Sequence, residues 1–155
     1  MAPAIVFIAV MATAANLYAA PANTRRHAPS TIDPAQTCVD TINSFREGLN
    51  MAPLARWRGG EACAASAAAG DSGAGEAHGA FRRCGEMAQN ECPDWPGPPG
   101  RMIAGCLRMM WEEGPGTDMA DHGHYINMTR NRYTEVACGF HTLPNGKVWS
   151  VQNFR

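Results

Sequence analysis

The sequence has little net charge and no concentration of basic residues. Its 155 residues hold 13 Lys and Arg against 14 Asp and Glu, which gives a formal net charge of -1. Without a basic patch, binding to nucleic acid is not expected. Beyond the first 22 residues no apolar run is long enough to cross a bilayer, so we expect no transmembrane segment. The length suits one domain, which we expect to be a monomer.

The chain also lacks the short motifs of several common hydrolases and metal sites. Neither G-x-S-x-G nor H-E-x-x-H occurs, so no serine nucleophile and no helical zinc-protease site is indicated. No two cysteines are spaced as C-x-x-C, which argues against a structural zinc site. These absences lean against an enzyme without excluding one.

The N-terminal residues differ from the rest of the chain. Residues 4–15 form an apolar run of signal-peptide length, and the small residues Ala19 and Ala20 that follow suit cleavage. We predict a signal peptide over 1–22, a polar linker over 23–36 and a folded domain over 37–155. The positive charges that usually precede the apolar run are missing, so an apolar N-terminus that is not a signal is the alternative.

Six cysteines follow the signal-like segment. An even number in this context predicts three disulfides and a secreted, extracellular protein, because such bonds persist in oxidising compartments. The sequence alone allows fifteen pairings. Our prediction joins the first two helices, closes a short loop and ties the third helix to a strand. The predicted pairs are Cys38–Cys63, Cys84–Cys92 and Cys106–Cys138.

Three helices are predicted from apolar periodicity and capping residues. The first starts at Asp33-Pro34, with Asp as N-cap, and ends near Gly48. The second covers residues 60–70, and the third covers 101–114. Between the second and third helices we expect a Gly-rich loop over 71–80 that carries His78, a short strand or turn followed by a helical turn over 81–92, and irregular backbone over the Pro-rich 93–100.

Near the C-terminus the apolar period changes from helical spacing to two. Residues 133–143 and 147–154 flank a turn at Asn145-Gly146, which predicts a β-hairpin. Apolar residues lie on both faces of these strands, so both faces of the sheet need a cover. Because helices precede the hairpin, the prediction is a layered α/β fold.

Residues 123–140, GHYINMTRNRYTEVACGF, resemble the signature of the CAP superfamily of cysteine-rich secretory proteins, antigen 5 proteins and plant pathogenesis-related class 1 proteins. That signature reads approximately G-H-[YF]-T-Q-x-V-W and is followed by a Gly-Cys pair. Gly123, His124 and Tyr125 match it, and Cys138 lies at the family interval. Departures from it include Ile126 for Thr, Asn127 for Gln, Arg130 for Trp and Ala137 for Gly.

Three further segments resemble the family in the same order. Residues 38–57 are similar to its opening helix, including Asn43 and Arg46. CGEMAQN resembles the G-E-N motif and supplies Glu86. MMWEEG resembles the W-x-x-E stretch, and His78 precedes Glu86 at about the family interval. The resemblance covers residues 38–155.

The resemblance implies a three-layer α-β-α sandwich, stapled by disulfides, whose cleft gathers His78, Glu86, Glu113 and His124. We prefer Glu113 over Glu112 because it is nearer the family spacing, and the two point about 100 degrees apart on a helix. His124 is expected on a turn just before the strand, with His122 as its solvated neighbour. Two imidazoles could share Zn²⁺ or another divalent ion.

Three functions remain open at this point. The preferred one is a secreted defence- or interaction-type protein whose His/Glu cleft binds an extracellular small ligand, lipid or protein. The second is a divalent-metal-dependent hydrolase in which Glu86 or Glu113 is the general base. The third, also implied by the resemblance, is a sterol or lipid carrier.

Overall fold

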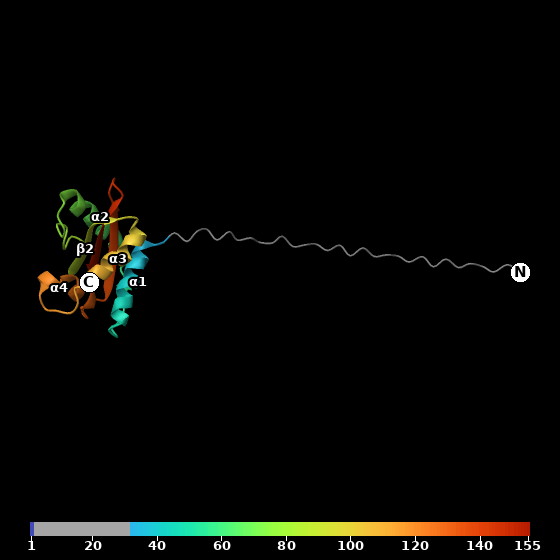
Figure 1. Cartoon of the computed structure of the whole chain (residues 1–155), viewed down its shortest axis with the longest axis horizontal. Helices are drawn as coiled ribbons and strands as arrows, with labels where there is room; N and C mark the ends of the chain where they lie inside the picture. The colour runs from blue at the N-terminus through green and yellow to red at the C-terminus, as the bar shows by residue number, and fades with distance from the viewer. Residues whose placement is uncertain (2–31) are drawn as a thin grey trace. The chain divides into compact units, whose positions relative to one another are not determined.

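The structure is a computed structural model that describes Met1 and residues 32–155. The predicted signal peptide over 1–22 lies outside the described residues, apart from Met1. Within residues 32–155, four helices and four strands follow one another; Figure 1 shows their arrangement. In order they are α1 (Pro34–Glu47), β1 (Ala55–Arg56), α2 (Arg58–Ala74), β2 (Ala88–Pro96), α3 (Pro99–Trp111), α4 (Met119–Thr129), β3 (Glu135–Thr142) and β4 (Lys147–Phe154).

The strands form one sheet in the order β1-β3-β4-β2. β3 and β4 pair antiparallel through the predicted hairpin, in which Gly146 has a φ of 82°. β4 also pairs antiparallel with β2, whereas the two-residue β1 runs parallel to β3. The last strand of the chain is therefore an internal strand of the sheet.

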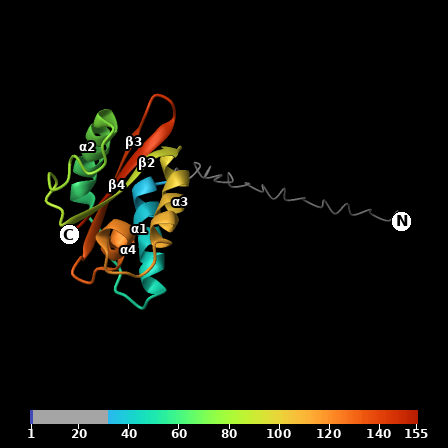
Figure 2. The same cartoon turned by 60° about the vertical axis from the view of Figure 1, so that its left-hand side comes forward.

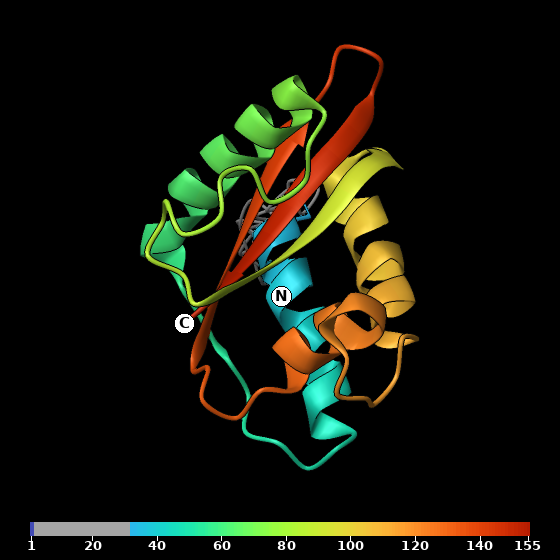
Figure 3. The ribbon, with the colours of Figure 1, turned by 90° about the vertical axis from the view of Figure 1, so that its left-hand side faces the viewer.

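Helices cover both faces of the sheet, which confirms the predicted α-β-α layering. In Figures 2 and 3, α2 lies on one face, while α1, α3 and α4 lie on the other. Successive β4 residues face opposite layers: Val148 and Phe154 join the core under α1 and α3, whereas Trp149 and Val151 pack against α2. This alternation follows from the period of two along a strand.

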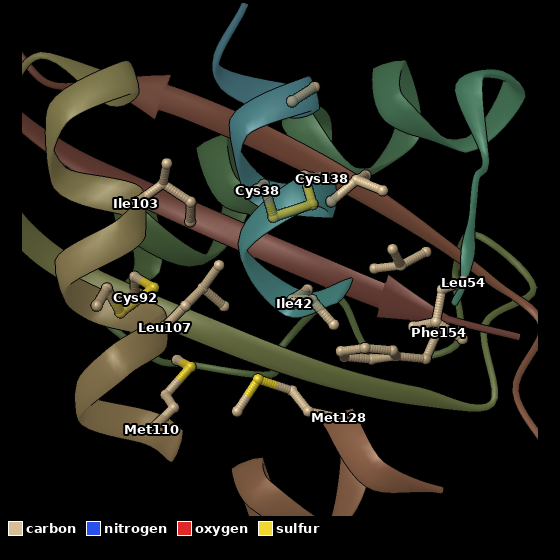
Figure 4. Close-up of a cluster of buried hydrophobic side chains, with 14 of the residues drawn as sticks. Cys38, Ile42, Leu54, Cys92, Ile103, Leu107, Met110, Met128, Cys138 and Phe154 are labelled. Carbon is tan, nitrogen blue, oxygen red and sulfur yellow. A yellow bond between two sulfur atoms is a disulfide. The ribbon is translucent and has the colours of Figure 1, made fainter. Parts of the chain in front are cut away.

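The layer of three helices holds the larger apolar core. Ile42 of α1 and Leu107 of α3 are completely buried against Phe154 of β4 (Figure 4). α1 begins as predicted, with the Asp33 side chain accepting hydrogen bonds from the first-turn amides of Ala35 and Gln36 at 3.1 and 3.2 Å. No helix within residues 32–155 is long and apolar enough to span a membrane.

The α2 layer is packed with small side chains. Ala64 and Ala68 are completely buried beneath Trp149 and Val151. A Cβ atom at Gly139 of β3 would lie 2.1 Å from the backbone nitrogen of Ala65, so the helix backbone approaches the strand as closely as a glycine permits. Burial on this face therefore depends more on the close approach of the α2 backbone to β3 than on the volume of the side chains.

All six cysteines form disulfides, but the predicted pairing is wrong. The bonds are Cys38–Cys138, Cys63–Cys84 and Cys92–Cys106. Cys38 bonds to β3 because α1 lies across that strand, and Figure 4 shows this bond inside the apolar core. The other bonds join α2 to the loop after it and β2 to α3. Pairing follows neighbours in space, which the cysteine order along the chain does not reveal.

β2 differs from the prediction, which gave a short strand or turn followed by a helical turn over residues 81–92 and irregular backbone over the Pro-rich 93–100. β2 is an edge strand, where a missing backbone donor is tolerated. Its pairing with β4 shifts register between Cys92 and Trp95, at Pro93-Asp94. The bulge thus accommodates the proline, and pairing resumes beyond it.

α4 was also not predicted, and it changes the setting of His124. We expected a turn leading into a strand, but residues 119–129 form a helix with Asp118 as N-cap. Tyr125 therefore does not alternate along a strand; it packs on Trp111 with ring centroids 4.5 Å apart. α2 is longer than predicted and continues past Gly70 to Ala74. Tertiary packing outweighs the weak local signals in both segments.

Candidate functional site

His124 is held by Glu113. α4 begins at Asp118, whose carboxylate accepts from the Ala120 amide at 2.8 Å, and His124 lies in the second turn of the helix. The Glu113 carboxylate follows the end of α3, binds Nδ1 of His124 and accepts from its backbone amide at 3.0 Å. Glu112, the alternative acid, is exposed. Glu113 therefore fixes both the ring and the backbone of His124.

His78 is supported by a different set of contacts. It lies after α2 with a φ of 65°, a left-handed conformation that is uncommon for a residue other than glycine. Its Nδ1 lies 3.0 Å from Oε1 of Gln89, and Nε2 of Gln89 donates to Asn153 at 3.0 Å. The backbone amide of His78 donates to Oε1 of Glu91 at 3.0 Å. β2 thus positions His78.

Glu91 is a buried acid that sequence reasoning missed. Its side chain is 1% exposed, and Oε2 accepts from the indole nitrogen of Trp149 at 2.7 Å. Burial raises the pKa of Glu91 to about 7, the hydrogen bond from Trp149 opposes this rise, and the nearby Asp71 carboxyl contributes to it. Asp71 is also buried, and its Oδ2 has no hydrogen-bond partner among the described residues.

Glu86 does not line the cavity that holds the histidines. Its carboxylate is buried and accepts from the backbone amides of Arg82 and Cys84 at 2.5 and 2.9 Å. Both oxygens therefore hold the loop that precedes β2. Of the four residues predicted to share the cleft, His78 and His124 line the cavity. Glu113 holds His124 without lining the cavity, and Glu86 stabilises the turn before β2.

His78 and His124 line one cavity of about 280 Å³. Met119, Ala120 and Gly123 contribute from α4, together with Asn127, and Gln89 contributes from β2. The two predicted histidines thus line the same cavity, His78 from the predicted loop and His124 from a helix that was not predicted.

A network of buried amides joins α4 to β2 below the cavity. Asn127 donates to Oδ1 of Asn90 at 2.9 Å, and Asn90 donates to the carbonyl oxygen of His124 at 3.2 Å. The signal that could have found these residues is the polar run Gln89-Asn90-Glu91 between Ala88 and Cys92. Three consecutive buried polar residues require internal partners, and these partners form the floor of the site.

Arg46 positions the far end of α4. It is 2% exposed and donates from Nη1 to the carbonyl oxygen of Met128 at 2.7 Å and from Nε to that of Ala52 at 2.8 Å. Burial lowers the pKa of Arg46. The residue that carried part of the family resemblance is thus a structural link between α1 and the helix that bears His124.

We predicted that His122 is a solvated neighbour of His124, but its ring contacts the backbone after α3. Its Nδ1 lies 2.7 Å from the carbonyl oxygen of Glu113 and 3.1 Å from that of Gly114. It therefore ties the chain after α3 to α4 and helps to place Glu113. The i to i+2 spacing on a helix points His122 and His124 in different directions.

The two imidazoles of the cavity have defined roles when neutral. Glu113 accepts from Nδ1–H of His124, and the amide oxygen of Gln89 accepts from Nδ1–H of His78, which leaves each Nε2 as a hydrogen-bond acceptor. Within residues 32–155, no group of three or more His, Cys, Asp and Glu side chains could hold a metal ion. Catalytic zinc sites use three protein ligands, so the donor set does not fit such a centre.

Comparison with known proteins agrees with this architecture. A family model described as the cysteine-rich secretory protein family, CAP, matches residues 39–154. The chain belongs to the CAP family. No curated relative matches this CAP protein in sequence.

Two solved structures share the CAP fold of this chain. The crystal structure of Na-ASP-1 is 12% identical with a TM-score of 0.57, and the match covers 78% of this chain and 38% of that one. The structure of Schistosoma mansoni venom allergen-like protein 4 is 13% identical with a TM-score of 0.54, and the match covers 79% of this chain and 87% of that one. At these identities the similarity shows the fold alone.

Proposed function

We propose that this CAP protein is secreted and binds an extracellular ligand in the cavity lined by His78 and His124. The observation that supports this most is the convergence of two positioned imidazoles in one cavity, one following α2 and one from α4. Cavities with a few convergent polar groups are typical ligand sites. Three disulfides support export, because they persist in oxidising compartments.

The contacts favour ligand binding over hydrolysis. Each candidate general base is fully engaged: Glu113 by His124 and its neighbour Tyr125, and Glu86 by two backbone amides. The two imidazole acceptors can instead receive hydrogen bonds from hydroxyl or amine groups of a ligand.

Ligand extraction tests the proposal. The protein is produced through a secretory route, and small molecules bound to it are released and identified by mass spectrometry. We expect a ligand with the parent protein and a loss of about tenfold or more in His78→Ala and in His124→Ala, since each loses a charge-assisted or neutral hydrogen bond. His141→Ala is the matched control, because His141 lies on β3 and does not line this cavity.

Equal ligand in all four proteins, or none in the parent, would contradict the proposal. Calorimetric titration of the same proteins with Zn²⁺ tests the hydrolase alternative. Two imidazoles without a third side-chain ligand predict weak binding. Tight binding of one Zn²⁺ per chain, lost in either cavity variant, would favour the metal-dependent alternative instead.

A further inference from the structure

A second groove continues from the histidine cavity. It has a volume of about 390 Å³ and shares His78, Gln89, Met119 and Asn127 with the first cavity. Its other walls come from the loop after α2, the start of β2 and the segment between α4 and β3. The residues that line it beyond the shared ones are Phe81, Arg82, Met87, Ala88, Arg130, Arg132 and Tyr133.

The groove concentrates positive charge. Arg82, Arg130 and Arg132 line it, and no Asp or Glu is among the described residues that line it. This is a local exception, because the whole chain has one more acidic than basic residue. A concave site with one sign of charge attracts ligands of the opposite sign.

The same groove concentrates exposed apolar side chains. Phe81 is 37% exposed, Met87 is 47% exposed and Met119 is 54% exposed, and each is among the large apolar residues most accessible to solvent. Their gathering around one groove is unlike scattered surface apolar residues, which need no explanation. The wall therefore offers an apolar surface beside the arginines.

Two of these arginines are held in place. The Arg132 guanidinium lies 5.2 Å from the centre of the Tyr133 ring and donates to the Tyr133 hydroxyl at 3.2 Å. The Arg82 guanidinium lies 5.4 Å from the centre of the Phe81 ring. Stacking on aromatic rings limits the freedom of an arginine and leaves its donors available.

Unusual backbone conformations present the groove residues. His78 and Arg82 have φ values of 65° and 70°, in the left-handed region that favours glycine. A buried glutamate accepts a hydrogen bond from the backbone amide of each residue: Glu91 from His78, and Glu86 from Arg82. Such conformations persist only where the surroundings enforce them, and they cluster at functional sites. Here the two left-handed residues are both walls of the groove.

We propose that this groove binds a small organic anion, a phosphate or sulfate monoester with an apolar tail. The guanidinium groups would receive the head, since their forked donors match its oxygens, and Phe81, Met87 and Met119 would cover the tail. The volume is that of a small-molecule site. The inference rests on the proposed function, because it names the class of ligand for the same cleft.

Calorimetry with three probes tests the proposal. Octyl phosphate carries both features, inorganic phosphate carries only the head, and octyl glucoside carries only the tail. We expect octyl phosphate to bind at least about tenfold more tightly than either of the others. Equal affinity for octyl glucoside and octyl phosphate would overturn the proposal.

Matched variants locate the site. Arg130→Gln and Arg132→Gln are each expected to weaken octyl phosphate binding about tenfold, the effect of one charge-assisted contact. Arg108→Gln, an equal charge change at an exposed position of α3, is expected to leave it unchanged. Met87→Ser is expected to weaken octyl phosphate binding without affecting inorganic phosphate. Unchanged binding in both groove arginine variants, with unchanged melting temperatures, would also overturn the proposal.

Two sources could supply such an anion, and a vesicle assay separates them. Sedimentation with phosphatidylcholine vesicles containing phosphatidic acid, abolished by Arg130→Gln, would identify a membrane headgroup. Octyl phosphate binding without vesicle sedimentation would identify a soluble ester. Loss of octyl phosphate binding in Arg130→Gln but not in His124→Ala would retain this inference while contradicting the proposed role of the histidine cavity.

Discussion

The two faces of the sheet are built on different physical terms. The face under α1, α3 and α4 buries large apolar side chains and two disulfides. The α2 face buries alanines and the two acids Asp71 and Glu91, and α2 packs directly against Gly139 of β3. His124 belongs to the first layer, whereas His78 follows the second. The cleft lies between these two faces. One face is stabilised by large buried side chains, and the other by the close approach of α2 to the sheet and by buried polar contacts.

The largest expected effect removes the strand that both faces share. Truncation before Lys147 deletes β4, which pairs with β2 and β3 and contributes Phe154 to one core and Trp149 to the other. We expect complete loss of cooperative folding, because two strands lose their partners and both cores lose their centre. Circular dichroism and thermal melting provide the measurement. A truncated chain that melts cooperatively would refute the shared role of β4.

On the apolar face, removing volume is expected to be costly. Leu107→Ala creates a cavity at a completely buried position, with an expected loss of about 2–5 kcal/mol in the free energy of unfolding. Met109→Ala is the control, since Met109 of the same helix is 50% exposed. Denaturant unfolding measures both. A similar loss in the two variants would show that burial does not govern this face.

On the α2 face, adding volume is expected to be costly. Gly139→Ala places a Cβ against the backbone of α2, and we expect a loss of about 3 kcal/mol from overpacking. Gly73→Ala provides the contrast, because nothing lies within 4 Å of a Cβ at that helical position. It should stabilise the protein by about 0.5–1 kcal/mol. Equal effects of the two changes would contradict the close approach of α2.

The smallest expected effect is a pH dependence of stability that arises from Glu91 on the α2 face. The folded-state pKa of Glu91 is about 7, above its ordinary value of 4.5, so the folded state binds this proton more tightly than the unfolded chain does. The stability that this proton contributes is present below pH 4.5 and is lost as the pH rises to about 7. Glu91→Gln mimics the protonated acid and should remove this loss.

Thermal melting from pH 5 to pH 8 measures the difference. Relative to the parent, Glu91→Gln should gain several degrees in melting temperature at pH 8 and little at pH 5. Glu47→Gln, at an exposed position of α1, is the control and should leave the pH profile unchanged. Parallel pH profiles for the parent and Glu91→Gln would show that Glu91 does not carry this proton.

The contrast between the faces also explains what the sequence revealed. The hairpin at Asn145-Gly146 and the start of α1 at Asp33 depend on local turn and capping chemistry, which the sequence states directly. The layered fold followed from apolar residues on both faces of β4. The motif around His124 predicted a residue that lines a cavity, although the helix that carries it was missed and its role as a site residue stays a prediction.

The elements that were missed depend on distant contacts. β2 forms despite Pro93 because β4 supplies the other half of its ladder, and α4 is fixed at one end by Arg46, 82 residues before Met128. The amide network and the Glu91 contacts likewise join segments remote in the chain. The consecutive polar residues of β2 indicated that polar side chains are buried, but only the fold shows which residues are their hydrogen-bond partners.

The Cys38–Cys138 bond spans 100 residues and joins the first cysteine of the chain to the last. If the chain is exported as we propose, its N-terminal part emerges first, and Cys38 meets four other thiols before Cys138 arrives. Oxidation in order of emergence would give Cys38–Cys63, a crosslink between α1 and α2 that the finished sandwich does not contain. On that route, formation of Cys38–Cys138 would need either delayed oxidation of Cys38 or exchange of an early bond by another thiol.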